Sequence, residues 1–365
     1  MQFTPGYYSG LDKLPPEYAS LFSERADLRF DQSLPWLRRL ADLFALQNGE
    51  ITIIGLSSNG QPVAALPLIK RPAQGLGADL QSAANFYTAY YGPVMSPSAS
   101  PADVGDALAD ALVRLPSRWQ VLDLNPMDPD SALFAGLAAG LRRRGAVVEP
   151  YFRFGNWYEE VGGRSYEQYH GGRPTQVRET VRRKGRKLDK DTAREFQIIT
   201  TPEDVDAAMN DYEAIYAKSW KQPEPHLDFL RNVAKDFAAA GWLRLGMLRV
   251  DGRPAAAQMW FVFSGTASIF KLAYDPDFQQ YSVGSLLTSH LMDYVISNDR
   301  VQTIDYLCGD DPYKKDWMSQ RRERWGLRAF RLRSLRGLAG AAHAFAGRIA
   351  RSWRARKAIE ASAKP

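Results

Sequence analysis

The chain has 365 residues, of which 45% are hydrophobic and 24% are charged, so it can bury a substantial core, and its length fits two domains better than one. No run of about 18 apolar residues could span a bilayer, and the first residues lack the basic and apolar regions of a signal peptide. The single cysteine, Cys308, excludes an internal disulfide, and four histidines without a cluster argue against a metal site. We therefore expect a cytoplasmic protein whose mechanism uses no metal.

The net charge of +6 is concentrated in two stretches of the chain. The first runs from Arg173 to Arg194, and the second, from Arg324 to Lys357, holds ten basic residues and no acidic one. Clusters of one sign attract ligands and surfaces of the opposite sign. The sequence therefore indicates anionic partners: coenzyme phosphates, a nucleotide-linked substrate, tRNA or an anionic membrane.

The first half of the chain has the pattern of a mixed α/β layer. Ser33 is placed to cap a helix that has Pro35 in its first turn, and Asn59-Gly60 is a strong hairpin signal. The expected elements are strands 51–56 and 62–69, helix 103–115, strand 120–124, helix 131–144 and strand 146–152. This alternation predicts an α/β fold.

The second half repeats this plan with clearer signals. Its expected elements are helices 203–219 and 226–240, strands 242–250, 254–263 and 266–274, helix 284–297, strand 301–308 and helix 312–320. The hairpins of the two halves share a local pattern, because Gly60 to Ala65 and Gly252 to Ala257 both read Gly-x-Pro-x-Ala-Ala. Together with the similar element order, this match predicts a duplication.

A loop of small residues lies between strand 266–274 and helix 284–297. Such a loop exposes backbone N–H groups at the positive end of the helix dipole, which suits a pyrophosphate. Ser-x-Gly before a helix is also a common helix cap, so the motif alone does not indicate a pyrophosphate site. Its position directly after the third antiparallel strand is what favours that interpretation. The candidate donor-binding residues of this loop are Gln279, Ser282, Val283, Gly284 and Ser285.

Ionisable and aromatic residues follow the buried strand 301–308. Open α/β sheets bind ligands beyond strand ends, so this run is a candidate site that includes Asp305, Tyr313 and Lys314. Asp311 reads more simply as the cap of a short helix. Trp317 is a candidate for substrate contact, with core packing as the alternative.

Three motifs follow one another in the second half: Tyr274-Asp275-Pro276, Ser282-x-Gly284 and Asp305-x-x-x-Gly309-Asp310-x-x-Tyr313-Lys314-x-x-Trp317. In this order they resemble the GNAT-type acyltransferases of the CelD group, relatives of the FemABX peptidyltransferases. The likeness is strong between about residues 244 and 325 and fainter over the first half. Ser282 stands where the pyrophosphate loop of the family usually has a glycine.

The resemblance implies two fused GNAT folds with mixed, mainly antiparallel sheets, and the transfer of an acyl or aminoacyl group to an amine, frequently in cell-envelope biosynthesis. We expect a GNAT-like half at 1–160, a basic helical connector at 161–200, a catalytic GNAT-like half at 201–334 and a basic amphipathic tail at 335–365. The donor is expected to be a thioester, with acyl-CoA as co-substrate and no permanently bound cofactor.

Thioester aminolysis needs a neutral amine near the carbonyl carbon, help for the oxyanion and a proton for the departing thiolate. Tyr313 is the candidate acid, Asp305 the candidate acceptor of the amine proton, and Lys314 a candidate phosphate or oxyanion partner. Backbone N–H groups at the end of strand 266–274 are placed to polarise the carbonyl. The other residues expected to contact substrate are Lys271, Tyr274, Tyr87 and Tyr90, although Lys271 reads equally as a half-exposed lysine and the aromatic loop at 85–93 as simple packing.

The two basic segments leave alternatives open. Arg178, Arg182, Arg186 and Lys190 recur every four residues, which suits either phosphate binding or a solvated helical face. Apolar residues at helical spacing from Leu335 to Trp353 fit either an anionic membrane or docking onto the protein. Aminoacyl-tRNA is therefore the rival donor, and a non-catalytic envelope protein is the rival of another class. DNA is not an expected partner, because the basic residues are not part of a recognition module.

Overall fold

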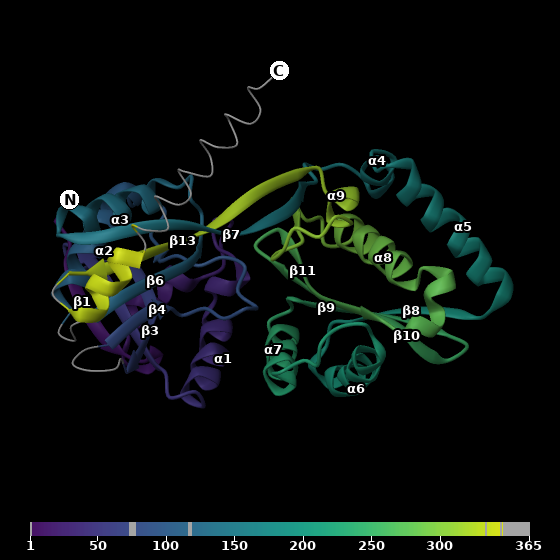
Figure 1. The fold of residues 1–365 in the computed structure, drawn as a ribbon. Helices are drawn as coiled ribbons and strands as arrows, with labels where there is room; N and C mark the ends of the chain where they lie inside the picture. The colour runs from purple at the N-terminus through teal and green to yellow at the C-terminus, as the bar shows by residue number, and fades with distance from the viewer. Residues whose placement is uncertain (1, 73–77, 116–118, 333, 344, 346–365) are drawn as a thin grey trace, which may run out of the picture.

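One continuous sheet runs through the molecule, with helices on both of its faces (Figure 1). The computed structural model describes residues 2–72, 78–115, 119–332, 334–343 and 345. The strand order is β1-β2-β3-β4-β6-β13-β7-β12-β11-β10-β9-β8, and β5 pairs with β3. Because the sheet is continuous, the two halves of the chain form one body rather than two separate domains.

The first half contains the helices and strands expected from the sequence, with β1, β4 and β5 in addition. The Ser33 hydroxyl accepts a hydrogen bond from the Trp36 N–H at the start of α1, and Asn59 and Gly60 make the β2–β3 turn with φ angles of 50° and 76°. Its elements are β1 (Thr4–Ser9), α1 (Leu34–Ala45), β2 (Glu50–Ser58), β3 (Gln61–Pro72), β4 (Ala78–Ser82), β5 (Val94–Met95), α2 (Pro101–Arg114), β6 (Trp119–Met127), α3 (Ala132–Arg143) and β7 (Ala146–Glu160).

The second half follows the expected order, with β8 and β13 in addition. Strand β12 is shorter than predicted, because the chain leaves the sheet after Asp305 and turns at Leu307 and Gly309, which have φ angles of 54° and 99°. The elements are α4 (Tyr166–Gly171), α5 (Thr175–Asp191), β8 (Arg194–Ile199), α6 (Pro202–Lys218), α7 (Leu227–Ala239), β9 (Leu243–Val250), β10 (Arg253–Phe263), β11 (Thr266–Tyr274), the 3-10 helix η4 (Pro276–Tyr281), α8 (Val283–Ser297), β12 (Thr303–Asp305), α9 (Lys314–Trp317) and β13 (Gln320–Arg331).

The two halves repeat one topology. A first strand, β1 or β8, is followed by helix α1 or helices α6 and α7, and then by three antiparallel strands. A helix, α2 or α8, leads to a strand that pairs in parallel with the last of the three, as β6 does with β4 and β12 with β11. The shared Gly-x-Pro-x-Ala-Ala stretches open β3 and β10, which are equivalent strands. The structure therefore confirms two tandem folds of one kind.

The last strand of each half is exchanged with that of the other. Strand β13, from the end of the second half, pairs with β6 of the first half, with Leu327 opposite Leu124. Strand β7 pairs with β12 of the second half and with β13 along most of its length. Figure 1 shows β7 and β13 running between the two halves. Neither half therefore completes its sheet without a strand from the other.

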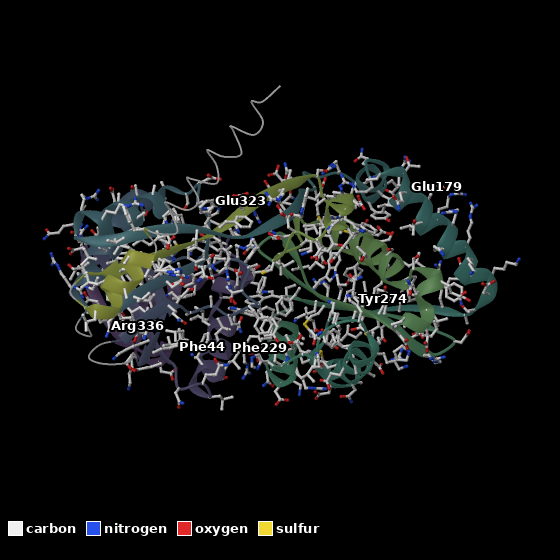
Figure 2. All side chains as sticks on the ribbon, in the orientation of Figure 1. Phe44, Glu179, Phe229, Tyr274, Glu323 and Arg336 are labelled. Carbon is white, nitrogen blue, oxygen red and sulfur yellow. The ribbon has the colours of Figure 1, made fainter. Side chains whose placement is uncertain are left out.

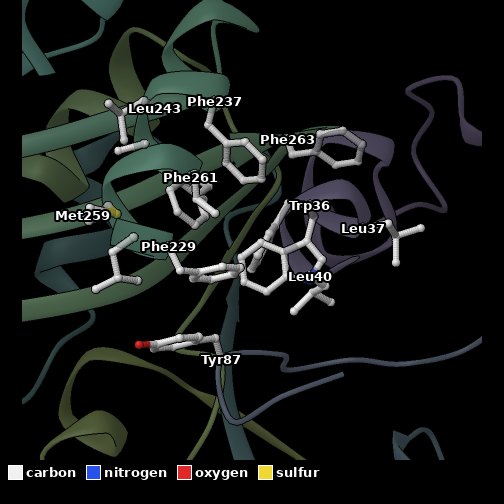
Figure 3. Close-up of a cluster of buried hydrophobic side chains, with 14 of the residues drawn as sticks. Trp36, Leu37, Leu40, Tyr87, Phe229, Phe237, Leu243, Met259, Phe261 and Phe263 are labelled. Carbon is white, nitrogen blue, oxygen red and sulfur yellow. The ribbon is translucent and has the colours of Figure 1, made fainter. Parts of the chain in front are cut away.

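A hydrophobic core is also shared between the halves. Trp36 from α1 packs against Phe229 of α7 and Phe270 of β11, with ring centroids 5.4 and 5.8 Å apart. Tyr87, from the loop after β4, stacks on Phe229 at 5.3 Å (Figure 3). A second core lies under α2 and α3, and a third lies under α8. The shared core fixes the aromatic loop of the first half against the second half.

The amphipathic tail falls mainly outside the described residues, including Ile349 and Trp353. Where it is described, Ala341 packs against Phe330 and Arg336 forms an ion pair with Asp79, so its first part docks onto the first half. Leu335 remains exposed, as does Phe345. Among the described residues, none of the helices has the length and apolar character that a bilayer-spanning segment needs.

The strand exchange predicts that a substitution late in the sequence loosens the first half. Leu327 of β13 is fully buried in the core under α2 and α3. Leu327→Ala should lower the free energy of unfolding by about 2–5 kcal/mol, because the cavity cannot close fully. Hydrogen exchange should show the loss of protection in α2 and β6 rather than in α8. Leu332→Ala, at an exposed position, is the control, and loss of protection confined to the second half would contradict the exchange.

Candidate active site

A cavity of about 220 Å³ lies where β11 and β12 separate. The two strands pair only from Thr266 to Ser268, and beyond Ser268 they diverge. The register of β11 against β10 shifts by one residue at Phe270, and such bulges often sit beside active sites. The lining comes from β11, the loop after β12, the loop after α6 and the aromatic loop of the first half; it includes Tyr87, Lys221, Lys271, Cys308, Tyr313 and Lys314.

Lys271 and Tyr87, both expected from the sequence to contact substrate, lie together in this cavity. The Lys271 Nζ is 2.6 Å from Glu224 Oε2 and lies 4.4 Å from the centre of the Tyr87 ring. The Tyr87 hydroxyl donates to the other oxygen of Glu224, and in Figure 3 this hydroxyl points away from Trp36. Burial lowers the pKa of Lys271, and the Glu224 charge opposes that shift. Lys271, Glu224 and Tyr87 therefore connect the aromatic loop of the first half to β11.

Lys221 lines the cavity and was not singled out by the sequence. It follows the end of α6, and its Nζ donates to the Leu272 carbonyl at 2.5 Å. Burial, followed by the charge of Lys271, lowers its pKa to about 8. A lysine with this pKa carries a substantial neutral fraction near physiological pH, so it can accept a proton. In the sequence, the only local feature that could have indicated Lys221 is its position after a helix, between Trp220 and two prolines.

Tyr313 lies at the mouth of the cavity with 42% of its surface exposed. Its ring meets Tyr306 edge to face, and its hydroxyl makes no hydrogen bond within the described residues. Burial and the nearby Asp311 charge raise its pKa, so the phenol keeps its proton at neutral pH. It is therefore free to donate a proton to a group in the cavity.

The loop before α8 has the form of an anion site. Ser282 adopts a left-handed conformation, with φ 53°, at the start of the helix, which explains why glycine suits this position. The N–H groups of Val283, Gly284 and Ser285 lie in the first turn, where no intrahelical acceptor is available. Val283 is fully buried, whereas Gly284 and Ser285 are partly exposed, so the backbone of these two residues is the part of the turn within reach of a ligand. Gln279 is exposed, and its carbonyl accepts from the Ser282 N–H.

Tyr274 connects this loop with β11. Its ring is tilted against the Trp220 ring, with centroids 4.7 Å apart, and lies 3.3 Å from where a Cβ on Gly284 would stand. Figure 2 marks the position of Tyr274 in the second half. One turn into α8, the Thr288 hydroxyl bonds to the Gly284 carbonyl and to Gln258, and the same hydroxyl contacts Tyr306 in the wall of the cavity. The start of α8 and the cavity therefore lie on neighbouring parts of one side of the sheet.

The basic helix α5 packs beside this loop. The Lys184 Nζ donates to the Gln280 carbonyl at 2.6 Å, and Lys187 reaches the Gln280 side chain and the Tyr281 ring. Arg182 pairs with Glu179 within the helix. The positive charge of α5 is thus held next to the candidate pyrophosphate loop, which raises the local affinity for anions.

Asp305 is not a general base, contrary to our expectation from the sequence. Its side chain is fully buried and accepts hydrogen bonds from Asn156, from the Leu307 N–H and from the guanidinium groups of Arg29 and Arg322. Burial tends to raise its pKa, but the two arginine charges outweigh burial and lower the pKa. A buried carboxylate that holds its charge this firmly has little tendency to take up a proton.

Lys314 and Trp317 also have structural roles rather than the predicted ones. The Lys314 ammonium is buried and donates to the carbonyls of Tyr306, Cys308 and Gly309, so it fixes the loop that forms one wall of the cavity. The Trp317 ring is buried in the core under α8 and does not line the cavity. Tyr90 lies apart from the cavity, against the guanidinium groups of Arg29 and Arg324.

A family model described as "Acetyltransferase (GNAT) domain" matches residues 175–315. The match contains α5, the loop before α8 and the cavity wall from Ile269 to Lys314. This part of the chain is therefore similar to the GNAT acetyltransferase domain. None of the curated proteins compared with the chain matches its sequence.

The whole chain is similar in structure to FemX, with a TM-score of 0.64, 10% identity, and coverage of 91% of this chain and 98% of FemX. It is also similar to a conserved protein of unknown function from Bacteroides thetaiotaomicron, with a TM-score of 0.56, 14% identity and coverage of 86% and 97%. It is similar as well to a protein described as the C-terminal domain of a lysylphosphatidylglycerol synthetase from Agrobacterium fabrum. For that structure the TM-score is 0.54 and the identity 13%, and the match covers 90% of this chain and 93% of that one. These likenesses confirm, at the level of the fold, the FemABX-related GNAT architecture that the motifs implied.

The position of Asp305 predicts a loss of stability rather than a simple loss of activity on substitution. Asp305→Asn should lower the free energy of unfolding by about 3–5 kcal/mol, because it leaves two guanidinium groups without their carboxylate. Since the pKa of Asp305 is lowered on folding, the wild-type contribution persists at neutral pH and disappears only in strong acid, and the variant should lack this acid-dependent loss.

Asp310→Asn is the matched control, because its pair with Arg321 is exposed and should contribute less than about 1 kcal/mol. Denaturant titrations of the three proteins from pH 8 into strong acid, down to about pH 1, measure both effects. An Asp305→Asn protein with wild-type stability and no transferase activity would support the base role instead.

Proposed function

We propose that the protein is an N-acyltransferase that moves an acyl group from acyl-CoA to an amine of a cell-envelope lipid, polysaccharide or peptide precursor. The observation that carries this proposal is the cavity between β11 and β12, which has an unbonded phenol and a lysine of lowered pKa in its wall and a free helix start on the same side of the sheet. The envelope acceptor draws support from the motif resemblance and from the neighbour described as a lysylphosphatidylglycerol synthetase.

The donor fits the α8 side of the cavity. The N–H groups of the first turn of α8, with the α5 lysines beside them, suit the diphosphate of coenzyme A. Beyond Ser268, β11 no longer has β12 as a partner, so the edge of this strand faces the cavity. Its N–H groups are available to a pantetheine arm or to the thioester oxygen, where they would stabilise the oxyanion.

The cavity residues divide the proton transfers between them. The amine nitrogen attacks the thioester carbon, a C–N bond forms and the C–S bond breaks. Lys221, in its neutral form, accepts the proton that the amine loses, and Tyr313 donates the proton that the thiolate takes up. Burial lowers the pKa of Lys221 and raises that of Tyr313. At neutral pH the cavity therefore contains a base, Lys221, and an acid, Tyr313.

The alternative donor is an aminoacyl-tRNA, which the exposed arginines of α5 favour. Of the regularly spaced set, Arg182 pairs with Glu179 and Arg178 bonds to Thr175 and to the Arg173 carbonyl. Arg186 instead lines a separate hollow of about 330 Å³ beside α8. These contacts leave less free positive charge along α5 than its sequence suggests, so we favour acyl-CoA.

A coenzyme-binding experiment tests the donor. Calorimetric titration with coenzyme A should show binding to the wild type, and Gly284→Trp should weaken it at least about tenfold, because the new side chain meets the Tyr274 ring and fills the loop. Gly171→Trp, where a Cβ would meet nothing within 4 Å, is the control. Displacement of the coenzyme by charged tRNA, or equal affinity in the Gly284→Trp variant, would overturn the acyl-CoA assignment.

The pH dependence of transfer tests Lys221. Because folding lowers its pKa to about 8, its neutral form increases as the pH rises through 8, so kcat/KM should rise with pH and level off above 8. Lys221→Gln and Lys221→Arg should both remove this rise and lower kcat by about a hundredfold or more. Lys218→Gln is the control, because Lys218 lies in the same segment and pairs with Asp275. A wild-type profile in Lys221→Arg would exclude the base role.

A further inference from the structure

Three arginines converge where the two halves meet. Arg29 lies between the core residues Leu28 and Phe30 of the first half, and Arg322 and Arg324 lie two residues apart on β13. Arg29 and Arg322 both bind the Asp305 carboxylate. Arg29 and Arg324 both lie against the Tyr90 ring, with guanidinium carbons 5.8 and 5.1 Å from its centre. We call these three side chains the arginine cluster.

Arg324 has no partner for its charge within the described residues. Only 3% of it is exposed, its Nε is buried without a hydrogen bond, and it forms no ion pair there. The Nε of Arg29 is likewise buried without a hydrogen bond. Burial, followed by the charges of Arg29 and Arg322, lowers the pKa of Arg324 to about 10. An unpaired buried charge costs several kcal/mol, so folds rarely keep one without a use.

The carboxylates nearby do not balance the arginine cluster. Asp305 is saturated by Arg29, Arg322, Asn156 and the Leu307 N–H. Asp31 accepts from the N–H groups of Ala89 and Tyr90, and its second oxygen is only 3.7 Å from the Arg29 Nε, without a hydrogen bond. The charge of Asp128 also acts on Arg324, but the two form no ion pair among the described residues. Two carboxylates in direct contact therefore face three guanidinium groups, and the third guanidinium has no ion-paired carboxylate.

The aromatic loop connects the arginine cluster to the wall of the candidate active site. The aromatic loop runs from Tyr87, in the cavity wall, to Tyr90, against the cluster. Cys308, also in the cavity wall, contacts the Thr88 carbonyl through its sulfur and lies three residues beyond Asp305. Lys271 and Glu224 lie against the same loop through Tyr87. Residues 87–90 thus connect the cavity wall to the cluster, and a ligand at the cluster would lie beside the loop that carries Tyr87.

We infer that Arg324 and Arg29 form a subsite for an oxyanion, a phosphate or a carboxylate, carried by the acceptor amine. The planar fork of a guanidinium matches both groups with two parallel charge-assisted hydrogen bonds. The transferase then recognises an acceptor by its amine in the cavity and its anionic group at the junction of the halves. This inference rests on the proposed function for the role of the ligand, but the anion site itself exists with or without transfer.

Anion binding to the full-length protein tests the subsite without any acyl donor. Inorganic phosphate and acetate, titrated at constant ionic strength, should raise the melting temperature of the wild type. Arg324→Met should bind the preferred anion at least about tenfold more weakly, because it removes a charge-assisted pair of hydrogen bonds. Without anions, the variant should melt at or above the wild-type temperature, since a buried unpaired charge has been removed. The ratio of the two affinities tells a phosphate site from a carboxylate site.

Two controls separate this site from other basic surfaces. Arg321→Met removes a charge from the same strand at an exposed position paired with Asp310, and should leave anion binding unchanged. The double variant Lys184→Met, Lys187→Met removes the charge beside the start of α8, and should also keep the Arg324-dependent binding. Wild-type anion affinity in Arg324→Met, or a variant that melts lower in every buffer, would overturn the subsite and make Arg324 a structural residue.

A kinetic comparison then assigns the anion to the acceptor. With acetyl-CoA as donor, Arg324→Met should raise KM for a primary amine that carries a phosphate or carboxylate by about tenfold or more, and should leave KM for the matching neutral amine unchanged. Equal effects on both amines would contradict recognition of the acceptor by its charge. Anion binding without transfer of either amine would instead contradict the proposed function while the subsite stands.

Discussion

The buried Asp305 carboxylate at the end of β12 is a contact at which residues from both halves of the chain meet. Its partners come from three parts of the chain: Arg29 from the first half, Asn156 from β7, and Arg322 from β13. Asn156 and Arg322 lie on the exchanged strands and reach the junction only because β7 and β13 are exchanged. A charge buried this deeply is tolerated only when it is fully paired, so the exchange, the network and the position of β12 depend on one another.

The opening of the cavity follows from the same contact. Because Asp305 ends its strand in a saturated network, the chain must leave the sheet, and it does so through left-handed residues at Leu307 and Gly309. The Lys314 ammonium then fixes that loop through three carbonyls, so the gap beside β11 does not close. Residues that the sequence marked as chemical groups therefore act mainly by shaping the space in which Tyr313 and Lys221 lie.

Local signals in the sequence predicted the local structure well. The Ser33 cap, the turn at Asn59-Gly60 and the helices from α6 to α8 follow from nearest neighbours along the chain, and the structure confirms them. Strand β13 was missed because its arginines look like part of a basic tail, whereas Arg328 pairs with Asp123, 205 residues away. The role of Asp305 was wrong for a similar reason, since Arg29 lies 276 residues away. Lys221 was missed because its environment is set by β11 and Lys271, which no local pattern reveals.

Two neighbouring parts of the candidate site would divide the recognition of the two proposed substrates. Beside α8, the backbone N–H groups of its first turn and the lysines of α5 suit a diphosphate. Around the cavity, the α6–α7 loop and the aromatic loop bring Glu224 and Tyr87 together, and the aromatic loop continues to the arginine cluster, so this second surface is built from both halves. The first half lacks a match to the acetyltransferase model, yet it supplies this second surface. In the proposed function, the second half would carry the chemistry, and the first half could change which acceptor it binds. The exchanged strands would keep the two halves in the same relative position during such a change.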